Sequence, residues 1–515
     1  MNKLIYTGLA ILAGLLNPVS TFAQENCSKI DPYPAEISNI NPWDDSRFGQ
    51  AKFKARDNNS LNVYYYLPSQ WNANSPIVFV MHGAARNALE YLETFAPVAE
   101  QYNTIALAPE FPERYYSQSE DYSLGVGISS VPYTGSYNAN EWKASDDYLY
   151  SEIEHLFETT KQLLALNTCG YFIVGHSAGG QFIHRMVSFI PDARIIRAVA
   201  ANSGWYTLPS KGPGNDINYY MPYGLQGSPI DLPRVRESFL QELIVLVGEN
   251  DTRTPSQDSS VRGTEEAMFQ GDNRNERGNF YFQTARQEAS DQNTTFNWQL
   301  DEVPEAGHDF DQIVQSAAWY LAYGGNACTS TTAANATQLV INEIHADPAF
   351  GSDGDANNDG NRDSQDDEFI EIINNGSQSI CLSGWTLGDS SETNRHVFPL
   401  GTNLLAGQAI VIFGGGIPTG DFGGSLVQWA AYSGSLSLSN NGDGIRLYDK
   451  QGTLAQQLSW GDCGDMNCAN EHISQNLEID QSIVRWPEIS GSWQSHTTTS
   501  NKLFSPGTQA NGNIW

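Results

Sequence analysis

The stretch that decides the fold is Tyr171-Phe-Ile-Val-Gly-His-Ser-Ala-Gly179. Its first four residues are aromatic or branched and apolar, which is typical of a buried strand, and a helical pattern follows directly. Glycines flank Ser177 in a Gly-x-Ser-x-Gly pattern, which predicts a tight turn between strand and helix where larger side chains would collide. Such a turn lifts the hydroxyl of Ser177 out of the sheet. We therefore predict a nucleophilic serine, with an ordinary turn serine as the alternative.

Apolar runs alternate with helical patterns on both sides of this motif. Continuous apolar strands alternating with helices predict an α/β fold, a doubly wound and mostly parallel sheet covered on both faces. The predicted strands are Pro76–Met81, Thr104–Ala108, Ile195–Ala201, Leu243–Val247 and Phe296–Val303, and the predicted helices are Asn87–Tyr102, Ser145 to about Leu166 and Phe310–Tyr323.

A nucleophilic serine needs a base, and the base needs an acid that orients it. With a serine on such a turn, the acid and then the histidine are expected later in the chain. Among nine histidines, His308 is the one between the last predicted strand and the last helix. Asp251 follows the strand that ends at Val247 and is the predicted acid, with Glu249 as the second candidate.

Backbone N–H groups complete the predicted site. Ala178 begins the helix after the serine, where its N–H can donate to a developing oxyanion. A second donor is expected on the loop that leaves the Pro76–Met81 strand, and the N–H of Ala84 is the best candidate. Together these two groups would form an oxyanion hole.

Residues 50–325 resemble the α/β-hydrolases, and within them the secreted esterases and polyester depolymerases. The resemblance rests on His82-Gly83, on the Gly175–Gly179 motif, on Gly248-x-x-Asp251 and on Gly307-His308. It implies a serine hydrolase that cleaves a carboxylic ester through an acyl-enzyme and needs no cofactor for catalysis. A serine peptidase on the same fold and a non-catalytic surface-binding protein are the alternatives.

The N-terminus predicts export. A basic start, an apolar run of about a dozen residues and small residues before a cut are the marks of a signal peptide, here residues 1–24. The mature protein would then be secreted, outside the cell or in the periplasm. Six cysteines in an oxidising compartment predict disulfides, although the sequence does not choose among the 15 possible pairings. Cys463 and Cys468 could close a local loop.

The texture of the sequence changes after the predicted hydrolase domain, residues 25–327. A small, polar stretch at 328–337 reads as an interdomain linker, and residues 338–515 carry short strand-like runs with Gly, Asn, Asp and Ser between them. This pattern predicts an all-β domain. The domain resembles the lamin tail domain in four stretches, Val340–Ile344, Asp367–Ile372, Leu382–Leu387 and Ser505–Thr508. The resemblance implies an immunoglobulin-like sandwich, and attachment, substrate targeting and stability are its candidate roles.

One loop of this second domain follows the calcium-binding pattern of EF-hands. Oxygen-bearing side chains occupy loop positions 1, 3, 5, 7, 9 and 12, and a glycine occupies position 6. A structural Ca²⁺ ion is therefore expected, and a solvated polar loop is the alternative. The predicted ligands are Asp355, Asn357, Asp359, Asn361, Asp363 and Asp366, the last standing where Glu is usual.

Charge limits the partners. The chain has 59 acidic and 27 basic residues, a net charge of −32, which disfavours nucleic acid and anionic lipid. No stretch is predicted to span a membrane. An ester substrate, small or polymeric, is expected, and the tail domain is a candidate for binding a surface or polymer. Aromatic clusters around Phe111, Trp205 and Tyr219 could line the substrate cleft or form the core of a lid.

Overall fold

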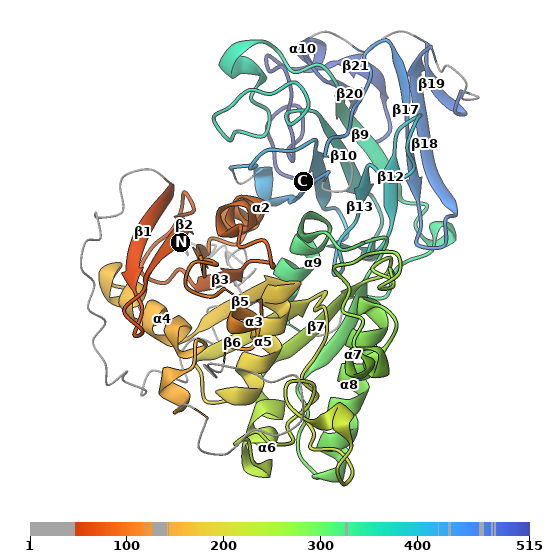
Figure 1. Cartoon of the computed structure of the whole chain (residues 1–515). Helices are drawn as coiled ribbons and strands as arrows, with labels where there is room; N and C mark the ends of the chain where they lie inside the picture. Colours follow the sequence, from red (N-terminus) through yellow and green to blue (C-terminus); the bar gives the residue numbers. More distant parts are fainter. Residues whose placement is uncertain are drawn as a thin grey trace, which may run out of the picture.

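The computed structural model describes residues 47–117, 119–125, 142, 144–324, 328–420, 422–430, 434–462, 468–474, 477 and 480–515. These residues form an α/β domain and an all-β domain that pack against each other (Figure 1). The predicted signal peptide, residues 1–24, lies outside the described residues. In the described ranges, no helix combines the length and the apolar character needed to cross a bilayer.

An eight-stranded sheet forms the centre of the first domain, in the order β1-β2-β4-β3-β5-β6-β7-β8. β1, β2 and β4 pair antiparallel, and every pairing from β4 through β8 is parallel. The predicted α/β class with a mostly parallel sheet is confirmed. The strands are β1 Phe48–Lys54, β2 Ser60–Tyr66, β3 Ile77–Met81, β4 Ile105–Pro109, β5 Tyr171–His176, β6 Ile195–Ala201, β7 Leu243–Gly248 and β8 Gln299–Val303.

Helices cover both faces of this sheet and create two separate cores. Val78 and Val80 pack on the face covered by α2 and α9, whereas Ile77 and Phe79 pack on the face covered by α4, α5 and α8. Successive side chains of a strand point to opposite faces, so a strand buried on both sides must be apolar throughout. The helices are α2 Ala88–Gln101, α3 Ser119–Ser123, α4 Ser151–Leu163, α5 Ala178–Phe189, α6 Leu232–Leu240, α7 Glu265–Gln270, α8 Arg274–Asp291 and α9 Phe310–Tyr323.

The second domain is a β-sandwich, as the sequence predicts. A six-stranded sheet, in the order β16-β15-β10-β9-β20-β21, and a five-stranded sheet, in the order β13-β12-β17-β18-β19, bury one apolar core between them. β11 and β14 form a separate two-stranded ladder. The elements are β9 Leu339–His345, β10 Phe369–Asn374, β11 Ile380–Cys381, β12 Thr386–Gly388, β13 His396–Val397, β14 Asn403–Leu404, β15 Ala409–Phe413, β16 Leu426–Trp429, β17 Gly442–Tyr448, β18 Leu454–Gly461, β19 Glu471–Ile473, β20 Ile483–Trp486, β21 Ser492–Ser495 and the short helix α10 His496–Thr499.

The two domains share a packed interface on α2 and α9 (Figure 1). Phe413 and Trp429 of the sandwich belong to the same apolar cluster as the residues of α9 that face them. The backbone N–H of Leu400 donates to the Ser316 hydroxyl at 3.1 Å, and the Gln315 side chain donates to the carbonyl of Trp429 at 3.2 Å. The sandwich therefore rests directly on the helix that follows His308.

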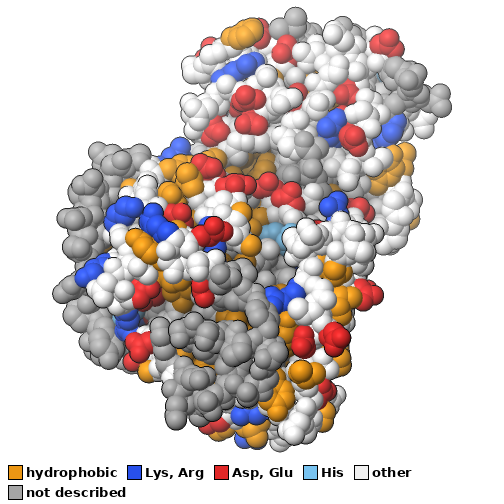
Figure 2. Space-filling view, viewed as in Figure 1, with side chains coloured by type: hydrophobic (Ala, Val, Ile, Leu, Met, Phe, Trp, Pro, Cys, Tyr) orange, Lys and Arg blue, Asp and Glu red, His pale blue; other side chains and the backbone are white. Residues whose placement is uncertain are grey.

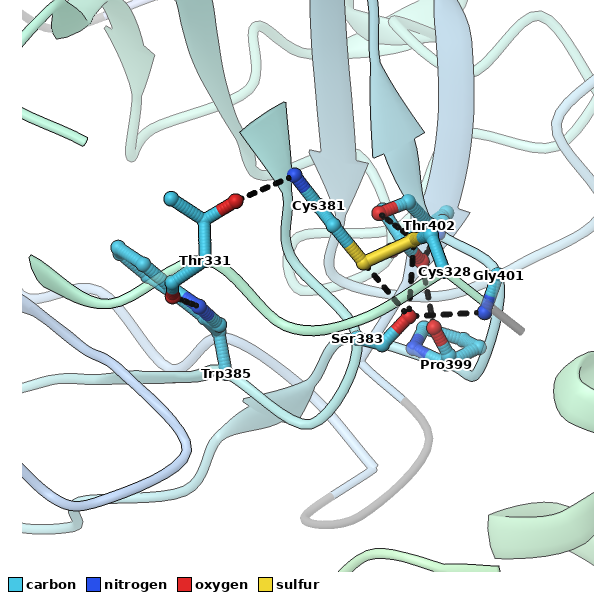
Figure 3. Close-up of a disulfide and its surroundings, with 9 residues drawn as sticks. Cys328, Thr331, Cys381, Ser383, Trp385, Pro399, Gly401 and Thr402 are labelled. Carbon is cyan, nitrogen blue, oxygen red and sulfur yellow. Dashed lines mark hydrogen bonds between the residues drawn. A yellow bond between two sulfur atoms is a disulfide. The ribbon is translucent and has the colours of Figure 1, made fainter. Parts of the chain in front are cut away.

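The segment between the domains, residues 328–337, is attached to the sandwich along its length (Figure 3). A disulfide joins Cys328 to Cys381. The N–H of Thr331 donates to the carbonyl of Cys381 at 2.9 Å, and the N–H of Cys381 donates to the Thr331 hydroxyl at 3.0 Å. The indole of Trp385 donates to the Thr331 carbonyl at 2.8 Å. The polar composition that suggests a free linker thus belongs to a strap whose polar groups bond to the second domain.

Other cysteines are oxidised as well. Cys169 and Cys468 each take part in a disulfide. The suggested loop between Cys463 and Cys468 has its first member outside the described residues, so this pairing stays a prediction.

Candidate active site

Ser177 stands on a strained turn between β5 and α5. Its backbone has φ 58° and ψ −115°, a conformation that residues with a Cβ rarely adopt. A Cβ built on Gly179 would lie 2.2 Å from the carbonyl oxygen of Met81, and one on Gly175 would lie 2.6 Å from the backbone of Gly179. Only glycines fit on either side of the serine, because the turn runs so close to β3.

Three side chains from three strand ends meet at this turn. Nε2 of His308 lies 3.1 Å from the Ser177 hydroxyl oxygen, and Nδ1 of the same ring lies 2.7 Å from Oδ2 of Asp251. The bond to Asp251 assigns the proton to Nδ1, so that Nε2 can accept from the serine. Asp251 is almost fully buried, whereas 26% of the His308 side chain is exposed. This arrangement can move a proton between Ser177 and a bound substrate.

Glu249, the second candidate for the acid, points elsewhere. It is exposed, and its carboxylate accepts from the backbone N–H of Glu305 at 2.9 Å. The structure therefore brings Asp251, and not Glu249, to the histidine.

Asn202 is a residue of the site that the sequence analysis did not find. It follows β6 with φ 45°, and it is fully buried. Its Oδ1 accepts from the N–H of Gly248 at 2.7 Å, and its Nδ2 donates to the carbonyl of Gly307 at 2.9 Å. One amide thus joins the end of β7, which carries Asp251, to the loop that carries His308. The available signal was a polar residue directly after an apolar strand.

The loop after β3 is organised by His82. Its Nδ1 lies 2.9 Å from the carbonyl of Gly83, and its Nε2 accepts from the N–H of Phe111 at 3.1 Å. Complete burial lowers the pKa of His82 to about 3, so the ring is neutral. Gly83 adjoins the serine, because a Cβ built on it would lie 3.9 Å from the Cβ of Ser177. Ala84 comes next on this loop and is exposed.

Both expected oxyanion donors therefore lie on segments that adjoin Ser177. Ala178 is the first residue of α5, and Ala84 lies one residue beyond the glycine that adjoins the serine. Their roles as donors stay predictions.

A second histidine ring lies against the first. His176, at the end of β5, packs against His308 with ring centroids 4.6 Å apart and ring planes tilted by 40°, and its Nδ1 lies 3.0 Å from the hydroxyl of Tyr91. Burial, followed by the charges of His308 and Arg274, holds the pKa of His176 well below its usual value. His176 therefore stays neutral and packs against one side of the His308 ring.

The aromatic clusters that were cleft or core candidates belong mostly to the core. Phe111, Trp205 and Tyr206 are 0%, 4% and 0% exposed. The guanidinium of Arg185, itself buried, covers the Trp205 ring at 4.2 Å. Tyr219, by contrast, is only half-buried. Phe111, Trp205 and Tyr206 therefore belong to the core of the domain.

The predicted calcium loop lies between β9 and β10. Its carboxylates bind backbone amides: Asp355 accepts from the N–H groups of Asp359 and Gly360 at 3.1 and 3.0 Å, and Asp363 accepts from that of Gln365 at 2.8 Å. Gly360, at the sixth position, has φ 91°. Among the described residues, no three His, Cys, Asp or Glu side chains come close enough together to hold a metal.

Repulsion inside this loop is nevertheless visible. Burial and neighbouring carboxylates raise the pKa of Asp355 and of Asp366. Asp367, which lies outside the sequence pattern, is fully buried and accepts from the N–H of Asn357, and its pKa is raised to about 6 by burial. The oxygen donors have the chemistry that Ca²⁺ prefers, and a cation would offset their repulsion. Calcium binding stays a prediction.

Comparisons with known proteins agree with the two domains. Residues 332–462 match the family model of the Lamin Tail Domain. No match was found among curated proteins.

Three solved structures are similar to about half of the chain. Poly(aspartic acid) hydrolase-1 from Sphingomonas sp. KT-1 is 33% identical over 53% of this chain and 98% of its own, with a TM-score of 0.48. LpqC, a poly(3-hydroxybutyrate) depolymerase from Bordetella parapertussis, is 26% identical over 53% and 89%, with a TM-score of 0.47. An S-formylglutathione hydrolase from Agrobacterium tumefaciens is 13% identical over 54% and 95%, with a TM-score of 0.34.

Proposed function

We propose that this chain, which belongs to the α/β-hydrolases and carries a lamin tail domain, is a serine hydrolase that cleaves carboxylic esters. One observation carries the proposal. A serine on a strained strand-to-helix turn lies 3.1 Å from a histidine that is itself held at 2.7 Å by a buried aspartate. That combination is what activates a serine hydroxyl for attack on an acyl carbon.

The reaction would run in two halves. Ser177 Oγ bonds to the acyl carbon while its proton passes to Nε2 of His308, and the backbone N–H groups of Ala84 and Ala178 bind the oxyanion. The tetrahedral intermediate collapses as His308 returns the proton to the leaving alcohol. Water then attacks the acyl-enzyme by the same route and releases the acid. Asp251 holds the imidazole and stabilises its positive charge throughout.

The experiment is hydrolysis of p-nitrophenyl esters from acetate to palmitate by the full chain beside Ser177→Ala. Ser379→Ala is the matched control, because Ser379 is exposed on the second domain. We expect turnover in the control and none above background in Ser177→Ala. Activity that survives in Ser177→Ala would refute the proposal.

Amide and polymer substrates belong in the same assay. Two of the three similar proteins named above are a poly(aspartic acid) hydrolase and a poly(3-hydroxybutyrate) depolymerase. Serine-dependent cleavage of poly(aspartic acid) or peptides without cleavage of any ester would replace the ester proposal with an amidase on the same triad.

Export and calcium complete the proposal. The disulfide between Cys328 and Cys381 supports maturation in an oxidising compartment, after removal of residues 1–24. The mass of the secreted protein tests this, because cleavage there leaves Glu25 as the first residue. Ca²⁺ is proposed as a structural ion of the Asp355–Asp366 loop. Acidic side chains are spread over both domains on the face seen in Figure 2, which supports the proposal that nucleic acid is not a partner.

A further inference from the structure

The far oxygen of Asp251 is bound by a buried arginine. While Oδ2 of Asp251 faces His308, Oδ1 lies 3.3 Å from Nη1 of Arg274, the first residue of α8. The side chain of Arg274 is 3% exposed and that of Asp251 is 2% exposed. A guanidinium is always charged, so a full positive charge lies within the network that must receive another when His308 is protonated.

The same helix start also fixes the backbone of the acid. The N–H of Asn275 donates to the carbonyl of Asp251 at 3.3 Å, and the Asn275 side chain donates to the carbonyl of Gly248 at 3.0 Å. Consecutive residues of α8 therefore hold the loop that carries Asp251 through its side chain and its main chain.

Other groups facing Arg274 are identifiable. Asp258 lies 3.6 Å from Nη1 and is only partly buried, and the Ser260 hydroxyl accepts from Nη2 at 2.8 Å. Arg277 lies one turn along α8, and the charge of Arg274 contributes to lowering its pKa. Asp258 therefore neutralises only part of the charge of Arg274.

The groups facing His308 are equally few. They are Asp251, the Ser177 hydroxyl, the neutral ring of His176 and the exposed Asp309, its neighbour in sequence. The charge of Arg274 reaches this far, since it contributes to the low pKa of His176.

We propose that Arg274 is a positioning residue that holds Asp251 toward His308 and, through its charge, extends activity to lower pH. The inference rests on the proposed triad. A cation on the far side of Asp251 opposes protonation of His308, because like charges repel strongly in a buried network. The charge of Arg274 should therefore show in the pH dependence of the reaction at Ser177.

The test compares Arg274→Gln, Arg274→Lys and Asp258→Asn with the wild type. The readout is the rate at which a fluorophosphonate modifies Ser177, measured from about pH 5 to about pH 9. This reagent reports proton transfer to His308 whatever the natural substrate is. Folding of each full-length variant is checked by its melting temperature.

Each variant has its own expected result. In Arg274→Gln the acid limb moves up by roughly 1 pH unit and the plateau rate falls roughly tenfold or more. Arg274→Lys keeps the charge but loses the fork geometry, so the plateau falls while the acid limb stays in place. Asp258→Asn unmasks the charge of Arg274, so the acid limb moves down by a few tenths of a unit and the plateau holds.

The opposite results overturn the inference. A folded Arg274→Gln with the wild-type acid limb would show a structural role alone, and if that variant does not fold, an unmoved limb in Asp258→Asn is decisive. Labelling of Ser177 without turnover of any ester would refute the ester proposal and leave this inference standing. A wild-type Ser177 that does not react would overturn both.

Discussion

Buried carboxylates lie at the centre of both domains, and their partners give them opposite uses. In the hydrolase domain, one carboxylate oxygen of Asp251 contacts His308 and the other contacts Arg274. The arginine balances the charge of Asp251, and the partly exposed His308 links it to the active site. In the sandwich, Glu343 and Glu371 face each other across β9 and β10, both fully buried. Their partners are mainly neutral donors, and burial raises the pKa of both.

The sandwich carboxylates fasten the end of the chain. Ser505 donates its N–H and its hydroxyl to Glu343, at 2.9 and 2.7 Å, and the N–H of Gly507 donates to Glu371 at 2.9 Å. The N–H of Ala510 donates to Glu488 at 2.7 Å. The buried Asp251 thus holds a histidine beside a serine, with a buried arginine on its other oxygen. Glu343 also has a histidine nearby, His496 at 3.9 Å, but Glu343 and Glu371 bind the segment that starts at Ser505, and we call this arrangement the latch.

The largest expected effect is a loss of activity when Asp251 loses its charge. Asp251→Asn keeps the shape of the acid but removes its charge and reverses the hydrogen bond to His308. We expect kcat on p-nitrophenyl esters to fall about 10⁴-fold with little change in the melting temperature. Glu249→Gln, two residues away and exposed, is the matched control and should stay near wild type. Equal losses in both variants would contradict the assignment of the acid.

A smaller loss is expected when the supports of the site are loosened. Asn202→Ala removes the amide that joins the end of β7 to the histidine loop, and it leaves the N–H of Gly248 without its partner. We expect kcat/KM to fall roughly 100-fold, because small displacements of reacting groups are costly. The free energy of unfolding should fall by about 1–3 kcal/mol, measured by urea denaturation. Unchanged kinetics would show that the two loops hold their places without Asn202.

The third prediction concerns the acidic loop Asp355–Asp366 of the sandwich, where Ca²⁺ would offset the negative charges as Arg274 does for Asp251. At a hundredfold excess over its Kd, Ca²⁺ should raise the melting temperature of chelator-treated protein by roughly 5 °C or more. Asp359→Asn should abolish most of this shift. Asp353→Asn, which changes an exposed aspartate outside the twelve-residue loop, should keep it. A shift that persists in Asp359→Asn would place the ion elsewhere.

The smallest effect concerns the latch and its pH dependence. Burial and the charge of Glu343 raise the pKa of Glu371 in the folded state, and burial raises that of Glu368 to about 8. A glutamate whose pKa is higher in the folded state binds its proton more tightly there than in the unfolded chain. The resulting stabilisation of the folded state is complete below the unfolded pKa near 4.5 and is lost as pH rises toward about 8. We expect the melting temperature to fall across that range.

Glu371→Gln should flatten this decline, since a neutral amide does not ionise. Its melting temperature should exceed that of wild type more at pH 8 than at pH 5, with esterase activity unchanged. A wild-type curve that rises with pH would contradict the raised pKa of these buried carboxyl groups.

The sequence was sufficient to predict those features of the fold and site that depend on a few consecutive residues at the end of a strand. The turn at Ser177, the helix Phe310–Tyr323 and the order of serine, acid and histidine were all predictable, because each depends on a short stretch of chain. Asn202 and Arg274 were not, because their importance comes from bonds to residues 46 and 23 positions away. The polar residue directly after β6 is a local signal for Asn202, but no local pattern reports which residues it bonds to.

Helices and strands were missed, or their ends misplaced, where polar residues obscure the spacing of the apolar residues. The helix predicted from Ser145 begins at Ser151, and residues 145–147 form a separate 3₁₀ turn. The hairpin of β1 and β2 was missed because its polar edge alternates with buried residues, and α8 was missed because most of its faces are polar. The attachment of the strap, residues 328–337, to the sandwich was not predictable, because its composition does not show that Cys328 bonds to Cys381.

That strap determines how far the second domain can reach. A module on a flexible tether sweeps a volume set by the tether and raises the local concentration of whatever it holds. Here the disulfide and the packed α9 interface remove the tether. If the sandwich binds a polymer or surface, the active site of the hydrolase domain must then lie at one fixed distance and orientation from it. The enzyme would cleave only the material that this orientation brings to Ser177, and would have to release the surface to reach the rest.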